Sequence, residues 1–165
     1  MIVLVGFMGA GKSTVGRLLA EQLNLSFIDT DAEIESRAGR SIAEIFADDG
    51  EPEFRRLEKE FVLRALGGKN AVIALGGGAV EDESIRAQLG NATVIHLELP
   101  TWEALERIGE DENRPMLDLE DPFALQARRR PLYAEVADET IDVSQKNVER
   151  IVGEIEMRLQ PDAEG

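Results

Sequence analysis

A glycine-rich segment near the amino terminus has the residue types and spacing of a phosphate-binding loop. Residues 6–13 read Gly-Phe-Met-Gly-Ala-Gly-Lys-Ser, which fits G-x-x-x-x-G-K-[ST] between a strand-like apolar run and a helix-period segment. The glycines let backbone N–H groups wrap a phosphate. Lys12 is expected to reach the β- and γ-phosphates, and the Ser13 hydroxyl is expected to ligate Mg²⁺. The residues predicted to bind a nucleotide here are Gly9, Ala10, Gly11, Lys12, Ser13 and Thr14.

Two common classes of nucleotide-binding protein do not match the chain. The dinucleotide fingerprint G-x-G-x-x-G fails because Thr14 stands where its third glycine belongs. GTP-specific switches read guanine with [NT]-K-x-D, and no lysine of this chain has Asp two positions later. The segment is therefore interpreted as a phosphate loop, and a GTPase is disfavoured.

Paired carboxylates follow the second strand-like run, in the tripeptide Asp29-Thr30-Asp31. Two acids at the end of a strand can do different work, one in the outer sphere of Mg²⁺ and one on a substrate hydroxyl. The alternative interpretation is that Asp31 only caps the helix expected to begin at Ala32.

Arginine and glycine residues provide further candidates for a ligand site. Arg55 lies in the first turn of a helix expected to begin near Pro52, where Glu58 can hold its guanidinium by an i,i+3 ion pair. Residues 76–78 are all glycine and follow an apolar run, which indicates close approach of the backbone to a ligand. A solvated surface arginine and a plain glycine turn are the alternatives.

Further cations could meet anionic ligands. Arg114 lies in an acidic segment, where a lid could close a cation over transferring phosphates. Arg128, Arg129 and Arg130 are consecutive, and local positive charge is needed if a nucleotide and a carboxylate are to meet in an acidic protein. A solvated helix face is the alternative for these three. His96 alternates with apolar residues in a strand-like run, so we expect it to be structural.

The elements that must position these residues follow from hydrophobic periodicity. The chain has 165 residues, 43% of them hydrophobic, which favours one domain. Strands are expected at residues 1–5, 25–28, 71–75, 93–99 and 140–143. Helices are expected between them, including one that Asp31 caps, one with a Ser41–Glu44 capping box and one that Thr101 caps. Alternation of this kind predicts a parallel α/β sheet covered on both faces, with ligands beyond the carboxyl ends of its strands. Residues 109–122 are predicted to be a mobile lid and residues 160–165 a frayed tail.

Composition excludes several function classes. The chain has 33 acidic and 18 basic residues, a formal net charge of −15, which argues against nucleic acid or an anionic membrane surface as a partner. It has no cysteine and one histidine, which excludes thiol catalysis and argues against a multi-histidine metal site. No apolar run approaches about 18 residues, so we expect a cytoplasmic protein without a membrane span.

Taken together, the motifs resemble those of the shikimate kinase family over nearly the whole chain. The phosphate loop is generic, but the combination is specific to that family; it comprises residues 6–14, 27–31, 39–42, 54–58, 76–80, 114–117 and 129–133. The resemblance implies a P-loop kinase fold with strand order 2-3-1-4-5. It also implies ATP-dependent phosphorylation of the 3-hydroxyl of shikimate, on the route to aromatic amino acids, with Mg²⁺ as the cofactor.

The same resemblance implies roles for individual residues. Ser13 corresponds to a Mg²⁺ ligand and Asp29 to a carboxylate near that metal, in place of the usual Walker B aspartate, which is absent after residues 71–75. Lys12, Asp31 and Arg114 are the predicted catalytic residues, and Arg114 and Lys146 are predicted to contact ATP, Lys146 against adenine. The predicted shikimate contacts are Asp31, Arg55, Gly76, Gly77, Gly78 and Arg129, and residues 31–60 are predicted to be a shikimate-binding subregion.

Two other functions remain open from the sequence. One is another small-metabolite kinase, such as a gluconate kinase, with the same phosphate loop and a different acceptor. The other is a regulatory module that binds a nucleotide without catalysis. The paired arginines and Asp-Thr-Asp favour a carboxylated polyol acceptor, which a binding module does not need. A monomer is the default expectation.

Overall fold

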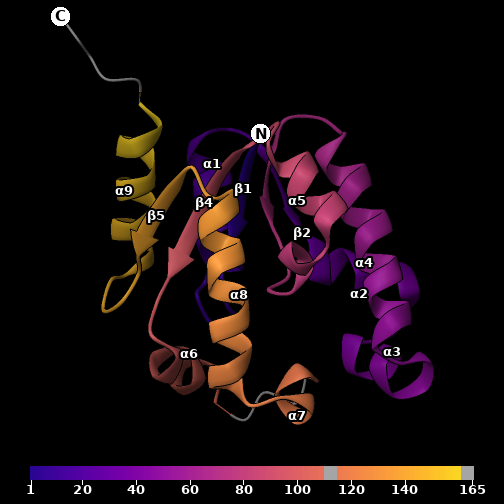
Figure 1. Ribbon diagram of the computed structural model, residues 1–165. Coiled ribbons are helices and arrows are strands. Elements are labelled where there is room, and N and C mark those ends of the chain that lie inside the picture. The colour runs from indigo at the N-terminus through magenta and orange to yellow at the C-terminus, as the bar shows by residue number, and fades with distance from the viewer. Residues whose placement is uncertain (110–114, 161–165) are drawn as a thin grey trace, which may run out of the picture.

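Five parallel strands form one sheet in the computed structural model, which describes residues 1–109 and 115–160 (Figure 1). The sheet has the order β2-β3-β1-β4-β5. The strands are β1 (Ile2–Val5), β2 (Ser26–Asp29), β3 (Ala71–Ala74), β4 (Thr93–Glu98) and β5 (Glu139–Asp142). Both the predicted parallel sheet and the strand order implied by the family resemblance are confirmed.

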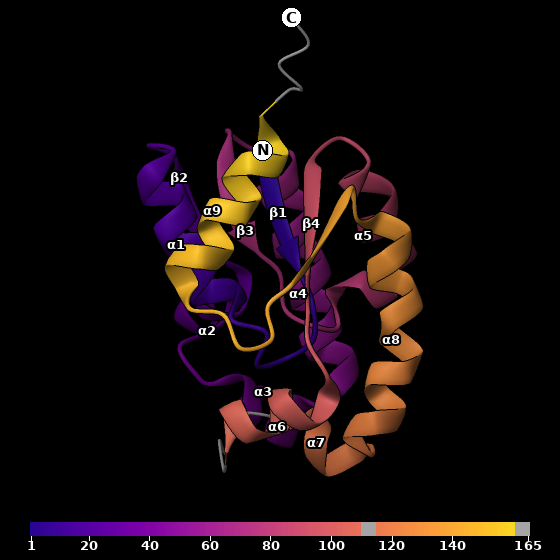
Figure 2. The same ribbon diagram turned by 90° about the vertical axis from the view of Figure 1, so that its left-hand side faces the viewer.

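Helices cover both faces of this sheet. Figure 2 shows α1 and α9 on one face and α5 and α8 on the other, whereas Figures 1 and 2 both place α3, α6 and α7 at the end where the strands finish. The helices are α1 (Lys12–Gln22), α2 (Thr30–Ala38), α3 (Ile42–Asp49), α4 (Glu51–Leu66), α5 (Glu83–Leu89), α6 (Thr101–Ile108), α7 (Met116–Leu119), α8 (Pro122–Val136) and α9 (Val148–Leu159), with a 3₁₀ turn η1 (Ala79–Glu81).

Two hydrophobic clusters hold these layers together. The larger one lies on both faces of the sheet, and β1 and β3 are buried along their whole length, as continuous apolar strands require. The smaller cluster joins α2, α3 and α4 beside the sheet; it consists of Ile34, Ile42, Ile45, Phe54 and Phe61. Because the smaller cluster orients α2 and α4, it positions the polar residues that these helices carry.

The helix starts test the capping predictions. The Ser41–Glu44 capping box is confirmed. The prediction that Asp31 caps a helix is wrong: Asp29, whose backbone is still extended, accepts a hydrogen bond from the Ala32 N–H at 3.1 Å, so α2 begins at residue 30. The prediction for Thr101 is also wrong, because the extended residue at the start of α6 is Pro100 and Thr101 is already helical.

The segment after α6 differs in part from the predicted irregular lid. Residues 116–119 form the short helix α7, and α8 already begins at Pro122, so these parts of the predicted lid at residues 109–122 are helical. Asp121 supplies the reason for the early start of α8, since its carboxylate accepts hydrogen bonds from the N–H groups of Phe123 and Ala124. Residues 110–114, which include Arg114, and the tail at 161–165 lie outside the described residues.

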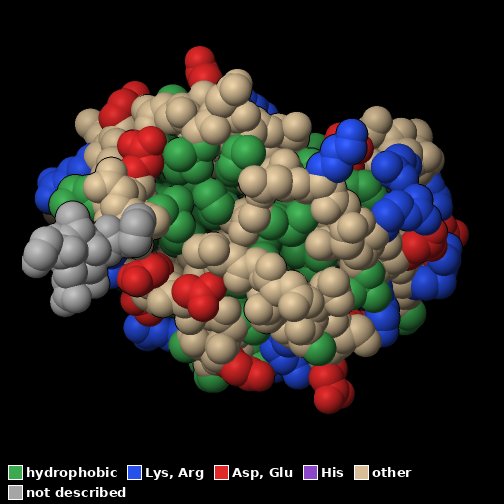
Figure 3. Space-filling view, turned by 90° about the horizontal axis from the view of Figure 1, so that it is seen from above, with side chains coloured by type: hydrophobic (Ala, Val, Ile, Leu, Met, Phe, Trp, Pro, Cys, Tyr) green, Lys and Arg blue, Asp and Glu red, His purple; other side chains and the backbone are tan. Residues whose placement is uncertain are grey.

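The carboxyl ends of the strands gather the loops that carry the motifs. The phosphate loop follows β1, Asp29 ends β2 and the three glycines follow β3. Figure 3 shows the opposite end, where Lys and Arg side chains lie in separate groups with Asp and Glu side chains between them. Within residues 1–109 and 115–160, no helix has the length and apolar character needed to cross a membrane.

Candidate active site

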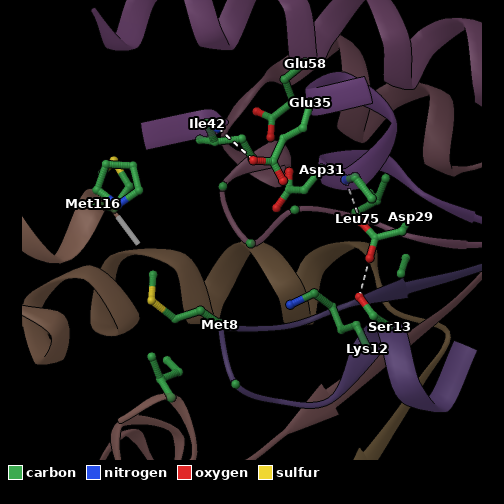
Figure 4. A pocket seen from close by; sticks show the side chains of 18 of the residues that line it. Met8, Lys12, Ser13, Asp29, Asp31, Glu35, Ile42, Glu58, Leu75 and Met116 are labelled. Carbon is green, nitrogen blue, oxygen red and sulfur yellow. Dashed lines mark hydrogen bonds between the residues drawn. The ribbon is translucent and has the colours of Figure 1, made fainter. Parts of the chain in front are cut away.

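The phosphate loop depends on glycines with left-handed backbone. Gly9 has φ 80° and Gly11 has φ 89°, values that side chains disfavour. A Cβ on Gly9 would also lie only 2.7 Å from the carbonyl oxygen of Ala104, so the loop lies directly against α6. Lys12, the first residue of α1, extends into the pocket, and its Nζ donates to the carbonyl oxygen of Gly6 at 2.7 Å (Figure 4). The loop therefore holds an ammonium group at its mouth, which suits an anionic phosphate.

Two side chains with oxygen atoms that could bind a metal ion lie beside this loop. The Ser13 hydroxyl donates a hydrogen bond to Oδ2 of Asp29, while Oδ1 of the same carboxylate caps α2 (Figure 4). The described residues hold no group of three or more His, Cys, Asp or Glu side chains arranged for a metal ion. Mg²⁺ in nucleotide-dependent enzymes typically takes few protein oxygens and completes its shell with phosphates and water. A hydroxyl beside a carboxylate at the phosphate loop fits this kind of site.

A second carboxylate lies on the opposite wall of the pocket. Asp31 sits in the first turn of α2 and faces Lys12 across the cavity (Figure 4). A Cβ on Gly76 would lie 2.5 Å from Oδ1 of Asp31, so only glycine lets the backbone come this close. The carboxylate is thus placed to accept a hydrogen bond from a hydroxyl group of a ligand in the pocket.

Two guanidinium groups converge on Gly78 from different helices. A Cβ at this residue would lie 2.6 Å from both Nη atoms of Arg55 on α4 and 2.7 Å from Nη2 of Arg129 on α8. Arg129 is only 1% exposed, and burial lowers its pKa from the ordinary arginine value, with the positive charge of Arg55 acting in the same direction. Among the described residues its Nη2 has no hydrogen-bond partner. A buried cationic nitrogen without a partner is costly, so this geometry favours an anion between the two arginines.

A carboxylate pairs with each arginine. Arg55 donates from Nη1 to Oε1 of Glu58 at 2.8 Å, which confirms the i,i+3 pair predicted from the sequence. Arg129 donates from Nε to Oε2 of Glu81 at 3.2 Å. Each pair orients a planar guanidinium group and leaves other nitrogens directed at the pocket.

The three consecutive arginines of α8 have different surroundings. Arg129 lines the cavity, whereas Arg130 is exposed and pairs with Glu98 at 2.6 Å. Arg128 pairs with Glu120 at 2.5 Å and with Glu81, the same carboxylate that holds Arg129. The alternative of a solvated helix face therefore fits Arg130, and Arg128 is linked to the site through Glu81.

Glu58 is a buried carboxylate of this site whose acidity is changed by its surroundings. It is 3% exposed, and burial raises its pKa to about 7 although the charge of Arg55 opposes this rise. The negative charge of Asp31 raises the pKa further. A Cβ on Gly76 would lie 3.1 Å from its Oε2, which has no hydrogen-bond partner among the described residues.

Most predicted site residues line one cavity of about 520 Å³. Those that line it are Gly9, Gly11, Lys12, Ser13, Thr14, Asp29, Asp31, Arg55, Gly76, Gly77, Gly78 and Arg129. Ala10 is buried beneath the loop. Lys146 is not in the lining, and its Nζ contacts Glu154 of α9 at 3.0 Å. Arg114 lies outside the described residues.

Sequence reasoning missed several residues at this cavity. Glu81 holds Arg129 from 48 positions away, and no local pattern relates the two. Glu35 and Arg107 line the cavity from α2 and α6. Glu35 could have been found by helix periodicity, since it lies one turn after Asp31, and its carboxylate accepts a hydrogen bond from the Ile42 N–H at 2.9 Å (Figure 4).

Comparison with known proteins gives a consistent result. The family model described as shikimate kinase matches residues 8–160. The shikimate kinase of Mycobacterium tuberculosis is 47% identical over 162 residues, covering 96% of this chain and 92% of that protein. The structure of shikimate kinase from Acinetobacter baumannii in complex with shikimate is 39% identical, with a TM-score of 0.90, covering 96% of this chain and 91% of that one. Shikimate kinase from Aquifex aeolicus is 37% identical, with a TM-score of 0.84 and coverage of 96% and 95%.

The buried Glu58 carboxyl predicts a specific pH dependence of stability. Because its pKa is raised on folding, it stabilises the protein fully below its unfolded value near 4.5 and loses this contribution as pH rises through about 7. In Glu58→Gln the glutamine side chain has no ionisable group. From pH 5 to pH 8, the free energy of unfolding of the wild type should therefore fall by roughly 2 kcal/mol relative to that of this variant. Urea unfolding at both pH values measures this difference. Glu60→Gln, at an exposed position of the same helix, is the control. If the free energy of unfolding of the wild type falls by the same amount relative to Glu60→Gln, the raised pKa of Glu58 is contradicted.

Proposed function

The chain belongs to the shikimate kinase family, and from this premise we propose that it transfers the γ-phosphoryl group of ATP to the 3-hydroxyl of shikimate. The products are shikimate 3-phosphate and ADP. One observation carries the choice of acceptor: the guanidinium groups of Arg55 and Arg129 converge at Gly78, and the buried Nη2 of Arg129 has no hydrogen-bond partner within the described part of the chain. This arrangement suits a carboxylate, and Asp31 beside it suits a hydroxyl on the same molecule.

The acceptor side of the proposed reaction uses charge and backbone together. Arg55 and Arg129 hold the carboxylate of shikimate by forked hydrogen bonds, which require planar guanidinium groups. The backbone of residues 76–78 supports the acceptor from one side. Asp31 orients the 3-hydroxyl toward the phosphate loop and accepts its proton as the new P–O bond forms.

The nucleotide side of the proposed reaction is the phosphate loop, residues 9–14. Its backbone N–H groups and Lys12 hold the β- and γ-phosphates and offset the charge that develops on the transferring group. Ser13 directly, and Asp29 through water, would hold a Mg²⁺ ion, which supplies further positive charge to the phosphates when it is bound. Arg114 is proposed to contact ATP from a lid at residues 109–122, and Lys146 to lie against adenine.

The remaining proposals concern organisation and setting. Residues 31–60, which contain α3 and most of α2 and α4, form the shikimate-binding subregion, and the smaller hydrophobic cluster, four of whose five buried residues lie in this range, supports the proposal. We infer a monomer that acts in the cytoplasm on two small molecules, without nucleic acid or membrane partners. The formal net charge of −15 supports the absence of a nucleic-acid partner.

An acceptor panel tests the proposed activity. ADP release is measured with ATP and Mg²⁺ in the presence of shikimate, gluconate, a nucleoside monophosphate or no acceptor. Of these acceptors, we expect only shikimate to support turnover. We expect no turnover from Lys12→Ala, which removes the ammonium group from the phosphate loop. Equal ADP release without shikimate, or none with it, contradicts the proposal.

Substitution of Arg129 tests how the carboxylate is recognised. Arg129→Lys retains a positive charge but loses the planar fork. A hydrogen bond to a charged group contributes about 1.5–3 kcal/mol, so the KM for shikimate should rise roughly 10- to 100-fold while the KM for ATP changes far less. Arg130→Lys is the matched control, because Arg130 is exposed on the same helix and should tolerate the change. A similar rise in both variants would indicate a diffuse positive field in place of a specific contact.

A further inference from the structure

Two residues of the sequence motifs lie outside the pocket yet contact the loop that lines it. Thr30 is the middle residue of Asp-Thr-Asp, and Tyr133 ends the segment Arg129-Arg130-Pro131-Leu132-Tyr133. Both side chains are fully buried, and neither lines the cavity. Their hydroxyl groups make hydrogen bonds to the glycine loop at residues 76–78 and to the end of β3 just before it.

The Thr30 hydroxyl bridges the point where β3 turns into the glycine loop. It accepts a hydrogen bond from the N–H of Gly76 at 3.1 Å and donates to the carbonyl oxygen of Ala74 at 3.3 Å. Thr30 is the first residue of α2 and precedes Asp31 in the chain. One side chain therefore ties the glycine loop to the helix turn that carries the proposed proton acceptor.

The Tyr133 hydroxyl holds the same loop from α8. It donates to the carbonyl oxygen of Gly77 at 2.6 Å, and its ring lies against His96, with ring centroids 5.1 Å apart. Burial raises the pKa of Tyr133 to about 12, so the phenol remains a donor throughout the range in which enzymes work. Tyr133 lies one helical turn after Arg129, so one face of α8 contacts both the loop and the pocket.

The glycine loop needs such external support because glycine restricts the backbone least and has no side chain to anchor it. Within the loop, the N–H of Ala79 donates to the carbonyl oxygen of Gly76 at 3.1 Å, whereas the N–H of Gly77 has no hydrogen-bond partner among the described residues. A Cβ on Gly77 would lie 3.4 Å from Nη1 of Arg129. A small shift of the loop would therefore change its spacing to the groups that face the acceptor.

We infer that Thr30 and Tyr133 are positioning residues for the phosphoryl acceptor, whose hydroxyl groups hold residues 76–78 from two sides at a set distance from Asp31 and Arg129. The inference rests on the proposed function, since it takes shikimate as the acceptor. The phosphate loop follows β1, whereas the hydrogen bonds of the two hydroxyls go to Ala74, Gly76 and Gly77. Loss of a hydroxyl should therefore weaken acceptor binding and leave nucleotide binding nearly unchanged.

Hydroxyl deletion and rescue test the inference. Tyr133→Phe and Thr30→Val each remove one hydroxyl with little change in shape, and Thr30→Ser restores it. From the ordinary contribution of one neutral hydrogen bond, the Kd and KM for shikimate should rise roughly 3- to 10-fold in the first two variants, with the KM for ATP changed less than about twofold. Thr30→Ser should resemble the wild type. Thr93→Val is the matched control and should change neither constant, because Thr93 begins β4 and so lies at the opposite end of the strands from the pocket.

Several outcomes would overturn the positioning role. Equal changes in the constants for shikimate and ATP, an impairment of Thr30→Ser as large as that of Thr30→Val, or unchanged constants in folded Tyr133→Phe and Thr30→Val would each contradict it. If Tyr133→Phe does not fold, the comparison of Val and Ser at position 30 decides the question. Wild-type turnover of shikimate is measured in the same series, and its absence contradicts the proposed function itself, whereas normal turnover with unchanged variant constants contradicts only the role of the two hydroxyls.

Discussion

The convergence of two arginines on a glycine backbone constrains the whole acceptor half of the molecule. Like charges brought together in a buried place repel one another and lose hydration, so their approach is stable only with compensating groups. Glu58, which lines the pocket, and Glu81, which does not, compensate through one nitrogen of Arg55 and one of Arg129. The inner nitrogens remain directed at Gly78, where any side chain would collide with them. Helices α4 and α8 must therefore pack so that these guanidinium groups meet, and an anionic ligand would accept hydrogen bonds from the nitrogens that face Gly78.

The parallel sheet brings this charged wall to the phosphate loop. Because β1, β2 and β3 end at one edge, the ammonium group of Lys12, the carboxylate of Asp31 and the glycine loop enter the same cavity. The side proposed to bind phosphate has left-handed glycines and a lysine, which suit a tetrahedral anion. The side proposed to bind the acceptor has planar guanidinium groups and buried hydroxyl groups, which favour one orientation of a carboxylated ligand. This division explains why the phosphate loop alone indicates a nucleotide and the distant motifs indicate the acceptor.

Features with local causes could be predicted from the sequence. The strand and helix alternation, the Ser41–Glu44 capping box and the Arg55–Glu58 pair depend on neighbours within one or two helical turns. Features that depend on tertiary packing could not: Glu81 and Tyr133 reach their partners across 48 and 56 positions, and no periodicity relates them. The error at Asp31 has a different cause, because Asp29 and Asp31 both suit a helix cap and only the end of β2 decides between them.

The proposed recognition of the acceptor depends most directly on its carboxylate group. Calorimetric titration of the wild-type protein with shikimate and with its methyl ester compares a charged and a neutral group at the same position. If Arg55 and Arg129 hold that carboxylate, the ester should bind at least about 10-fold more weakly, since hydrogen bonds between charged groups contribute about 1.5–3 kcal/mol. An ester that binds as tightly as shikimate would contradict the central role of the two arginines.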